Sequence, residues 1–237
     1  MSKNCLNDLN RTFYLNILKT LCQIFWGPDI SLCQDIISGE LTKLLQEIAV
    51  SFKIDQTVAI QAVARIAAEY KSTEALYSDL SESYVALFVN DINEITAPLY
   101  HSCYQTSHSR LMGPPAIDMK NRLKRHGLSI SLPGNEPADH LCIELEYIYY
   151  LLARGWSESN RELVNEAVQF CRESMADWVR QLCEKVTADG RFMFYVAGAE
   201  LMRITIQRLS EMTNCQESIS RTEPFEKSES LSFGDIS

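Results

Sequence analysis

A six-residue stretch in the middle of the chain, Asn135-Glu136-Pro137-Ala138-Asp139-His140, concentrates polar chemistry. It lies between the break Leu132-Pro133-Gly134 and an apolar run from Leu141 to Ala153. Two carboxylates and an imidazole in one place could contact a polar ligand or move protons. The same residues also suit a helix start, because proline is favoured at the first helical position and acids stabilise the positive end of the helix dipole.

The helix-start interpretation accounts for most of this stretch. Asn135 or Glu136 would cap the helix, and Asp139 would fall in its first turn. His140 does not fit, because an imidazole gains nothing from the positive end of a helix. We therefore expect a partner to hold His140, and Glu136 and Glu144 are each four positions away.

Signatures of catalysis are mostly absent from the sequence. It has no glycine-rich phosphate loop and no G-x-S-x-G motif. Its four histidines form no H-E-x-x-H pair, and His140 with Glu144 would supply only two metal ligands. We predict that the protein is not an enzyme and that it has no catalytic residues, no cofactor and no metal.

The composition bounds the class of protein. With 237 residues, of which 46% are hydrophobic and 22% charged, the chain can form one large or two small globular domains. A net charge of −9, with no basic cluster beyond Lys120 to Arg125, argues against nucleic-acid binding. The eight cysteines include no C-x-x-C pair, so neither a zinc knuckle nor a thioredoxin-type motif is supported. Most cysteines fall in apolar helical patterns, and without a signal sequence or membrane span we expect a cytoplasmic protein with reduced thiols. No apolar run reaches about 18 residues and the start does not resemble a signal sequence, so we expect no membrane span.

Helical periodicity runs through nearly the whole chain and predicts an all-α fold. The expected helices cover approximately residues 13–25, 32–48, 58–70, 80–88, 98–105, 117–126, 137–153, 160–186 and 192–209. Ser159 with Glu162 would form a capping box for the helix from 160. We predict one all-helical domain over residues 1–212, with halves at about 1–127 and 137–212 and a hinge at 128–136. The polar residues 213–237 are expected to form a disordered tail.

Aromatic side chains gather near the connectors that flank the polar stretch. They are Tyr100, Tyr104, Tyr147, Tyr149 and Tyr150. They either fill the core or line a groove for an apolar peptide. Acidic groups at the rim of such a groove would favour a ligand that carries arginine.

Residues 136–140 resemble the E-P-x-D-H signature of the TorD/DmsD/NarJ-like redox-enzyme maturation chaperones. Further pieces follow in the family's order. Tyr84 to Phe88 is similar to its Y-x-x-L-F segment, and Ala97 to Ser102, followed by Tyr104, to its proline-aromatic-serine stretch. The resemblance covers about residues 9–209 and also includes Leu111-Met112-Gly113, His126-Gly127-Leu128 and Phe170 to Trp178.

The chain departs from the family pattern before Trp178. Ser174 stands where the family usually has a histidine, and Asp177 where it usually has a proline. Any role that this histidine plays elsewhere is therefore in doubt for this chain.

The resemblance implies an all-helical, non-catalytic chaperone of the cytoplasm. Such a protein binds the twin-arginine signal peptide, the apo form, or both, of a molybdopterin oxidoreductase precursor. It assists cofactor insertion and prevents premature export. The expected peptide-binding residues are Tyr84, Leu87, Phe88, Pro98, Tyr100, Ser102, Tyr104, Glu136, Pro137, Asp139 and His140. The acids and His140 would make polar contacts, the Leu, Phe and Tyr side chains would form walls, and Pro137 would fix the loop.

Two alternatives remain open at this point. A NarJ-like assembly factor would serve a reductase catalytic subunit that lacks a signal peptide. A weak nucleotide-binding or nucleotide-hydrolysing protein is the other, since guanine-nucleotide binding is associated with the family. The connector at 127–136 would also permit a homodimer formed by helix exchange, as in some relatives.

Overall fold

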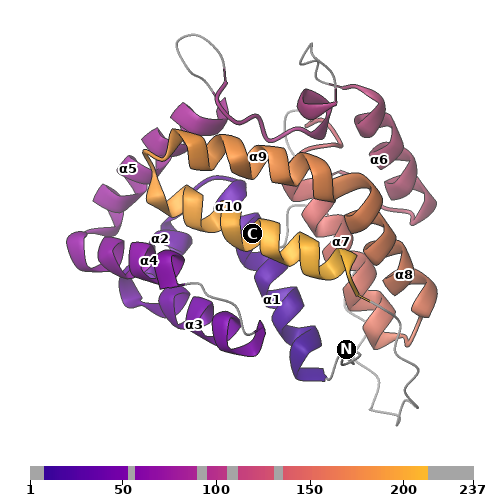
Figure 1. Cartoon of the computed structure of the whole chain (residues 1–237), viewed down its shortest axis with the longest axis horizontal. Coiled ribbons are helices and arrows are strands. Elements are labelled where there is room, and N and C mark those ends of the chain that lie inside the picture. Colours follow the sequence, from indigo (N-terminus) through magenta and orange to yellow (C-terminus); the bar gives the residue numbers. More distant parts are fainter. Residues whose placement is uncertain (1–7, 53–56, 90–94, 106–111, 131–135, 213–237) are drawn as a thin grey trace. The chain divides into compact units, whose positions relative to one another are not determined.

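The computed structural model describes residues 8–52, 57–89, 95–105, 112–130 and 136–212. These residues form helices and no β-strand, which confirms the predicted all-α fold (Figure 1). The elements are α1 (Asp8–Phe25), α2 (Ile30–Ser38), α3 (Glu40–Phe52), α4 (Thr57–Glu69), α5 (Thr73–Tyr84), the π-helix η1 (Val85–Val89), the 3-10 helix η2 (His101–Tyr104), α6 (Pro114–Arg125), α7 (Leu141–Ser157), α8 (Arg161–Phe170), the π-helix η3 (Cys171–Met175), α9 (Ala176–Asp189) and α10 (Met193–Ser210).

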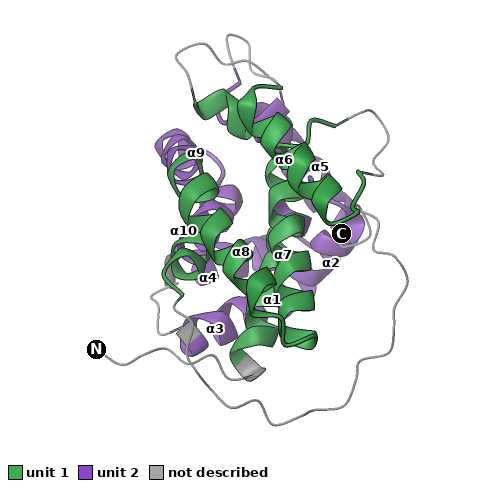
Figure 2. Ribbon diagram, turned by 90° about the vertical axis from the view of Figure 1, so that its right-hand side faces the viewer, with its two compact units in different colours: residues 1–22, 100–178, 205–237 green, residues 23–99, 179–204 purple. Residues whose placement is uncertain are grey.

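None of the described helices is both long enough and apolar enough to cross a membrane. The chain divides into two compact units (Figure 2). Unit 1 comprises residues 1–22, 100–178 and 205–237, and unit 2 comprises residues 23–99 and 179–204. The predicted halves stay a prediction, although residues on both sides of the expected hinge belong to unit 1. The hinge residues 131–135 and the predicted tail 213–237 lie outside the described part of the chain.

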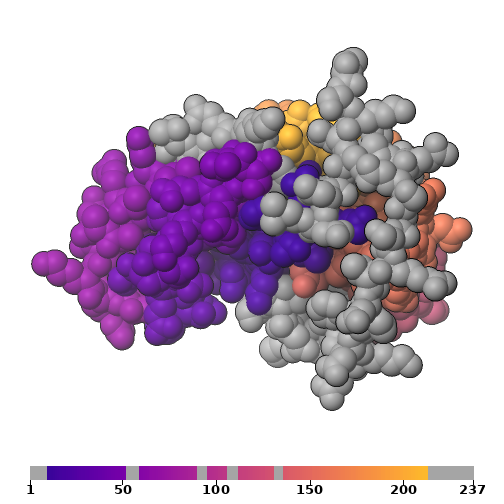
Figure 3. Space-filling view, turned by 90° about the horizontal axis from the view of Figure 1, so that it is seen from below, coloured from indigo at the N-terminus to yellow at the C-terminus, as the bar shows by residue number. Residues whose placement is uncertain are grey.

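Unit 2 is built on well-capped short helices and a cluster of aromatic rings. Asp29 caps α2 by accepting the Leu32 N–H at 2.7 Å, and Gly39 ends the helix with φ 82°. Phe88 contacts the rings of Phe25, Tyr84 and Tyr195 at centroid distances of 5.2–5.8 Å. The surface of α2 to α4 can be followed in the purple part of Figure 3.

Unit 1 is organised around α7. Its residues from Leu141 to Ile148 are buried on every side, as expected of a helix in the middle of a core. Tyr147 Oη donates to Glu166 Oε1 at 2.6 Å, which joins α7 to α8. The Glu166 Oε2 atom lies 3.0 Å from Nε2 of His126, the residue that ends α6. These contacts hold three helices against one another.

Several expected helices differ from those in the structure. The single helix expected over residues 32–48 is wrong, because left-handed Gly39 ends α2 and α3 begins at Glu40. Residues 98–105 form only the 3-10 turn η2, because Tyr100 pairs with another segment instead of continuing a helix. The predicted capping box at Ser159 and Glu162 is wrong. Ser159 is left-handed, with φ 54°, and Asn160 Oδ1 instead accepts the N–H groups of Glu162 and Leu163.

Gly155 brings α7 and α8 into close contact, and this closeness can be tested. A Cβ at position 155 would lie 2.7 Å from Val164 Cγ2 and 3.1 Å from the backbone oxygen of Asn160. Gly155→Ala should therefore lower the free energy of unfolding by about 1–3 kcal/mol, even though alanine favours helix formation. Urea unfolding measures this, with Ser157→Ala on the same helix as the control, expected within about 0.5 kcal/mol of wild type. A more stable Gly155→Ala protein would contradict the close packing.

Candidate functional site

The polar stretch ends at the true start of α7, where His140 is the N-cap. Its Nδ1 accepts the backbone N–H of Cys142 at 3.2 Å. Burial lowers the pKa of His140 to about 3, so the ring is neutral near pH 7 and Nδ1 keeps its lone pair. The expectations that the helix starts at Pro137, capped by Asn135 or Glu136, and that an imidazole gains nothing there are both wrong. Asn135 lies outside the described residues.

The residues before α7 pair with those before η2. The His101 N–H donates to Asp139 O at 3.0 Å, within an antiparallel bridge between Tyr100 and His140. The Tyr100 ring meets the His140 ring edge-on at 5.2 Å, and Tyr100 Oη donates to Glu136 Oε1 at 2.7 Å. These contacts fix two segments about 40 positions apart against each other. Burial of Tyr100, together with its hydrogen bond to Glu136, raises the pKa of its hydroxyl.

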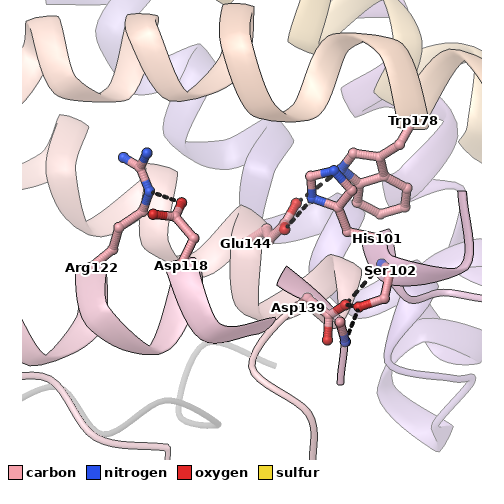
Figure 4. Close-up of polar contacts among 8 residues, drawn as sticks. His101, Ser102, Asp118, Arg122, Asp139, Glu144 and Trp178 are labelled. Carbon is pink, nitrogen blue, oxygen red and sulfur yellow. Dashed lines mark hydrogen bonds and ion pairs between the residues drawn. The ribbon is translucent and has the colours of Figure 1, made fainter. Parts of the chain in front are cut away.

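Asp139 anchors this pairing from inside. Its carboxylate is fully buried, and Oδ2 accepts both the backbone N–H of Ser102, at 2.9 Å, and the Ser102 hydroxyl (Figure 4). The Ser102 Oγ atom in turn accepts the N–H of Gly113, the N-cap of α6, at 3.0 Å. Asp139 Oδ1 has no hydrogen-bond partner among the described residues. Asp139 and Ser102 are thus positioned to hold three segments together.

A second polar network lies one turn into α7. Glu144 is 1% exposed; its Oε1 lies 3.1 Å from His101 Nδ1, and its Oε2 accepts Nε1–H of Trp178 at 3.1 Å (Figure 4). The rings of His101 and Trp178 are stacked at 5.3 Å. Burial raises the pKa of Glu144, although His101 and Trp178 act in the opposite direction. Glu144 and Glu136, which we expected to hold His140, instead bind His101 and Tyr100.

A cavity of about 250 Å³ opens beside this network, entirely within unit 1. Its apolar walls are Pro114, Pro115, Met119 and Phe170. Its polar lining consists of His101, Gln105, Asp118, Glu144, Glu173 and Ser174. Three carboxylates therefore face a cavity whose lining contains neither lysine nor arginine. The π-helix η3 carries Glu173 and Ser174 to this wall, and π-helical turns are frequent at functional sites.

The predicted binding residues fall into two groups. Unit 1 holds Tyr100, Ser102, Tyr104, Glu136, Pro137, Asp139 and His140, and unit 2 holds Tyr84, Leu87, Phe88 and Pro98. Six of the eleven are buried: Ser102, Asp139, His140, Leu87, Phe88 and Pro98. Only the half-buried ones, Tyr84, Tyr100, Tyr104, Glu136 and Pro137, offer surface to a ligand without rearrangement. Peptide binding by these eleven residues stays a prediction.

Sequence reasoning missed several residues that line the cavity. In the sequence Glu144 stands out only as a possible partner for His140, and no spacing distinguishes His101 from its neighbours Tyr100 and Ser102. Asp118 and Glu173 carry no motif, and in the sequence they look like ordinary exposed acids. Across the described ranges, no group of three or more His, Cys, Asp or Glu residues could hold a metal ion.

Three kinds of similarity connect the chain with known proteins. The family model for the nitrate reductase delta subunit matches residues 54–184. The chain is 29% identical over 128 residues to the chaperone protein TorD of Vibrio vulnificus strain YJ016, a match that covers 52% of this chain and only 59% of that protein. TorD of Photobacterium profundum is 22% identical over 192 residues, which covers 76% of this chain and 88% of the relative. A crystal structure described as a redox enzyme maturation protein from Archaeoglobus fulgidus has a TM-score of 0.48 and 18% identity, over 87% of this chain and 98% of that one.

The Ser102 hydroxyl should be required for stability. Ser102→Ala removes one donor to the buried Asp139 and the acceptor of the Gly113 N–H. We expect a loss of about 1–3 kcal/mol in the free energy of unfolding, measured by urea denaturation. Ser78→Ala on the exposed surface of α5 serves as the control. A Ser102→Ala protein as stable as this control would show that Asp139 is satisfied in another way.

His140 should make stability depend on pH in a defined direction. Its folded pKa of about 3 lies below the ordinary value of 6.5, so the unfolded state takes up a proton first as pH falls. The stabilisation is present above pH 6.5 and is lost as pH falls towards 3, by up to about 1.4 kcal/mol per pH unit. His140→Asn keeps a capping side chain but does not titrate, so its free energy of unfolding should fall less between pH 7 and 5. Equal pH slopes for the two proteins would contradict a neutral, buried His140.

Proposed function

We infer that this chain, which belongs to the nitrate reductase delta subunit family, is a chaperone for the maturation of a molybdenum-containing oxidoreductase. It binds the precursor of that enzyme in the cytoplasm, through its twin-arginine signal peptide, its apo form, or both. Binding assists cofactor insertion and prevents export before the enzyme is complete. The similarity to proteins named TorD chaperones supports this role.

The acidic cavity of unit 1 is the observation that carries the proposal. A twin-arginine signal peptide presents two guanidinium groups beside an apolar stretch. The cavity offers Asp118, Glu144 and Glu173 for a guanidinium, since carboxylates and arginine form strong, often bidentate hydrogen bonds.

Two exposed apolar side chains stand close in the sequence to the prolines of the cavity wall. Met112 is 59% exposed and Ile117 is 62% exposed, and they flank Pro114 and Pro115 in the chain. An isolated exposed apolar residue needs no explanation, but two in the segment that supplies the cavity wall suit the apolar part of the peptide. Tyr100, Tyr104 and Glu136 add half-buried aromatic and acidic surface within unit 1.

Calorimetric titration with a twin-arginine peptide and its Lys-Lys version tests the proposal. The arginine peptide should bind at least tenfold more tightly, because two ammonium groups cannot reproduce the planar donor pattern of guanidinium. In the double variant Asp118→Asn with Glu173→Gln, the dissociation constant should rise about 2- to 30-fold, as expected for the loss of two exposed ion pairs. Glu162→Gln with Glu158→Gln, two exposed acids that do not line the cavity, provides the control. If a folded, monodisperse protein binds neither peptide, signal-peptide recognition is wrong.

A second candidate is an assembly factor for a reductase catalytic subunit without a signal peptide. The description of the matching family, the nitrate reductase delta subunit, favours it. Copurification separates the two roles, because the assembly factor should retain a catalytic subunit that has no twin-arginine leader.

A cavity of about 250 Å³ is smaller than the roughly 300–1,000 Å³ of usual small-molecule sites, so it lends no support to nucleotide binding. Homodimer formation by helix exchange stays a prediction.

A further inference from the structure

Helix α6 carries an excess of positive charge in an acidic chain. Its basic residues are Lys120, Arg122, Lys124 and Arg125, and its one acidic residue is Asp118. The whole chain has 22 basic and 31 acidic residues. A local excess of one sign attracts groups of the opposite sign, so α6 is a place where an anionic partner would be drawn to this protein.

Contacts within the protein neutralise only part of this charge. Arg122 Nε donates to Asp118 Oδ2 at 2.6 Å (Figure 4), and Arg122 Nη1 lies 4.0 Å from Glu166 Oε1. Lys120 and Lys124 are exposed, and neither forms an ion pair with a residue that the structure describes. The charges of these two lysines are therefore available to another molecule.

The two lysines share one side of the helix with an amide and an apolar side chain. Ile117, Lys120, Asn121 and Lys124 are all exposed and follow the i, i+3, i+4, i+7 spacing of a single helix face. Ile117 is 62% exposed. Arg125, with a side chain that is 62% exposed, adds a further positive charge at the end of the helix. We call these five residues the basic face.

The helix dipole explains only the end of the basic face. Arg122, Lys124 and Arg125 lie in the last turn of α6, where cations stabilise the negative end of the dipole. Lys120 lies before that turn, and an exposed Ile117 contributes nothing to the dipole. Stabilisation of the helix end therefore does not account for the whole pattern.

The basic face is fixed in place by the other contacts of α6. At the start of the helix the Gly113 N–H donates to Ser102 Oγ at 3.0 Å. On the inner side Leu123 is 2% exposed, and the guanidinium of Arg122 lies over the Phe170 ring at 4.9 Å. Because the backbone of the face is already ordered, a partner would pay little conformational entropy to bind it.

The spacing and charge of the face indicate the kind of partner. Lys120 and Lys124 are one helical turn apart, so carboxylates one turn apart on a second helix can reach both. Ile117 suits an apolar neighbour of those carboxylates. A nucleic acid or an anionic membrane fits less well, because its charge extends over a broad area and would also meet the acids of a chain with a net charge of −9.

We propose that the basic face of α6 docks an acidic helical segment of a partner protein. Carboxylates of that segment contact Lys120 and Lys124, an apolar side chain covers Ile117, and Arg125 strengthens the attraction. The docking does not depend on signal-peptide binding, although Ile117 borders both surfaces. Each exposed ion pair contributes little, so the affinity comes from several together and falls as salt is added.

The probe is a fluorescently labelled, amidated repeat of Glu-Ala-Ala-Leu, which places carboxylates one helical turn apart. Fluorescence anisotropy with the full chain should show saturable binding that weakens with added salt. The same repeat with glutamine in place of glutamate should bind about tenfold more weakly, because it keeps the apolar side chains and loses the charge. Equal binding of the two probes overturns the proposal.

Charge reversal tests the two lysines directly. In Lys120→Glu with Lys124→Glu, the dissociation constant of the glutamate probe should rise by at least about tenfold, because attraction becomes repulsion. Lys71→Glu with Lys185→Glu changes the net charge equally at exposed positions outside α6 and should stay within about twofold of wild type. If the reversal lowers the helical content, Lys120→Gln with Lys124→Gln replaces it, with an expected rise of about 2- to 30-fold.

A charge swap provides a second measurement. A labelled repeat of Lys-Ala-Ala-Leu should bind Lys120→Glu with Lys124→Glu about tenfold more tightly than it binds wild type, because the opposite charges are restored. A lysine probe that does not distinguish the two proteins contradicts docking on the basic face.

The competing occupants are a membrane and a second copy of this chain. Vesicles of phosphatidylglycerol that bind through Lys120 and Lys124, while the glutamate probe does not bind, would overturn the protein partner in favour of a membrane surface. Self-association of wild type that is lost on charge reversal, again without binding of the probe, would overturn it in favour of a second copy.

The two proposals fail separately. Asp118→Asn with Glu173→Gln, which should weaken the twin-arginine peptide, should bind the glutamate probe at least as tightly as wild type does. A twin-arginine peptide that binds while the glutamate probe does not overturns the basic face and leaves signal-peptide binding intact. The opposite result supports the basic face and contradicts signal-peptide recognition.

Discussion

The buried carboxylate of Asp139 is the interaction on which the site depends. Removing an ionised carboxylate from water costs several kcal/mol unless donors replace the water. Asp139 obtains them from the backbone and hydroxyl of Ser102, and Ser102 in turn accepts the N–H of Gly113. One carboxylate therefore fixes the residues before α7, the turn η2 and the start of α6. The last two of these segments supply His101, Pro114 and Pro115 of the cavity lining.

The same anchor explains how neighbouring residues reach different networks. Ser102 faces Asp139, and His101, one position earlier, faces Glu144 in α7. His140 caps α7 and so sets where its first turn begins, which places Glu144 one turn inside the helix. The polar stretch that dominates the sequence thus acts mainly by position: its buried members hold the scaffold, while Glu144 and His101 face the cavity.

The sequence predicts the helices well because their apolar periodicity is a local property, and the outcome for α6 shows this. Prediction from the sequence fails where contacts between residues far apart in the chain decide the structure. Capping preferences predict that α7 starts at Pro137, but Ala138 and Asp139 form a turn and His140 pairs with Tyr100 before the helix begins at Leu141. The pairing of Glu144 with His101 joins residues 43 positions apart, and no spacing rule indicates it. The motif identifies the region of the site, whereas the cavity beside it can be recognised only from the folded structure.

The departure at Ser174 is understood in the same way. By the resemblance, a histidine usually stands one helical turn before Trp178, where this chain has Ser174, and serine cannot replace an imidazole. In the structure, however, His101 stacks on Trp178, and His101 and Ser174 line the same cavity. An imidazole is therefore present against Trp178, supplied by η2 instead of by the helix that carries the tryptophan.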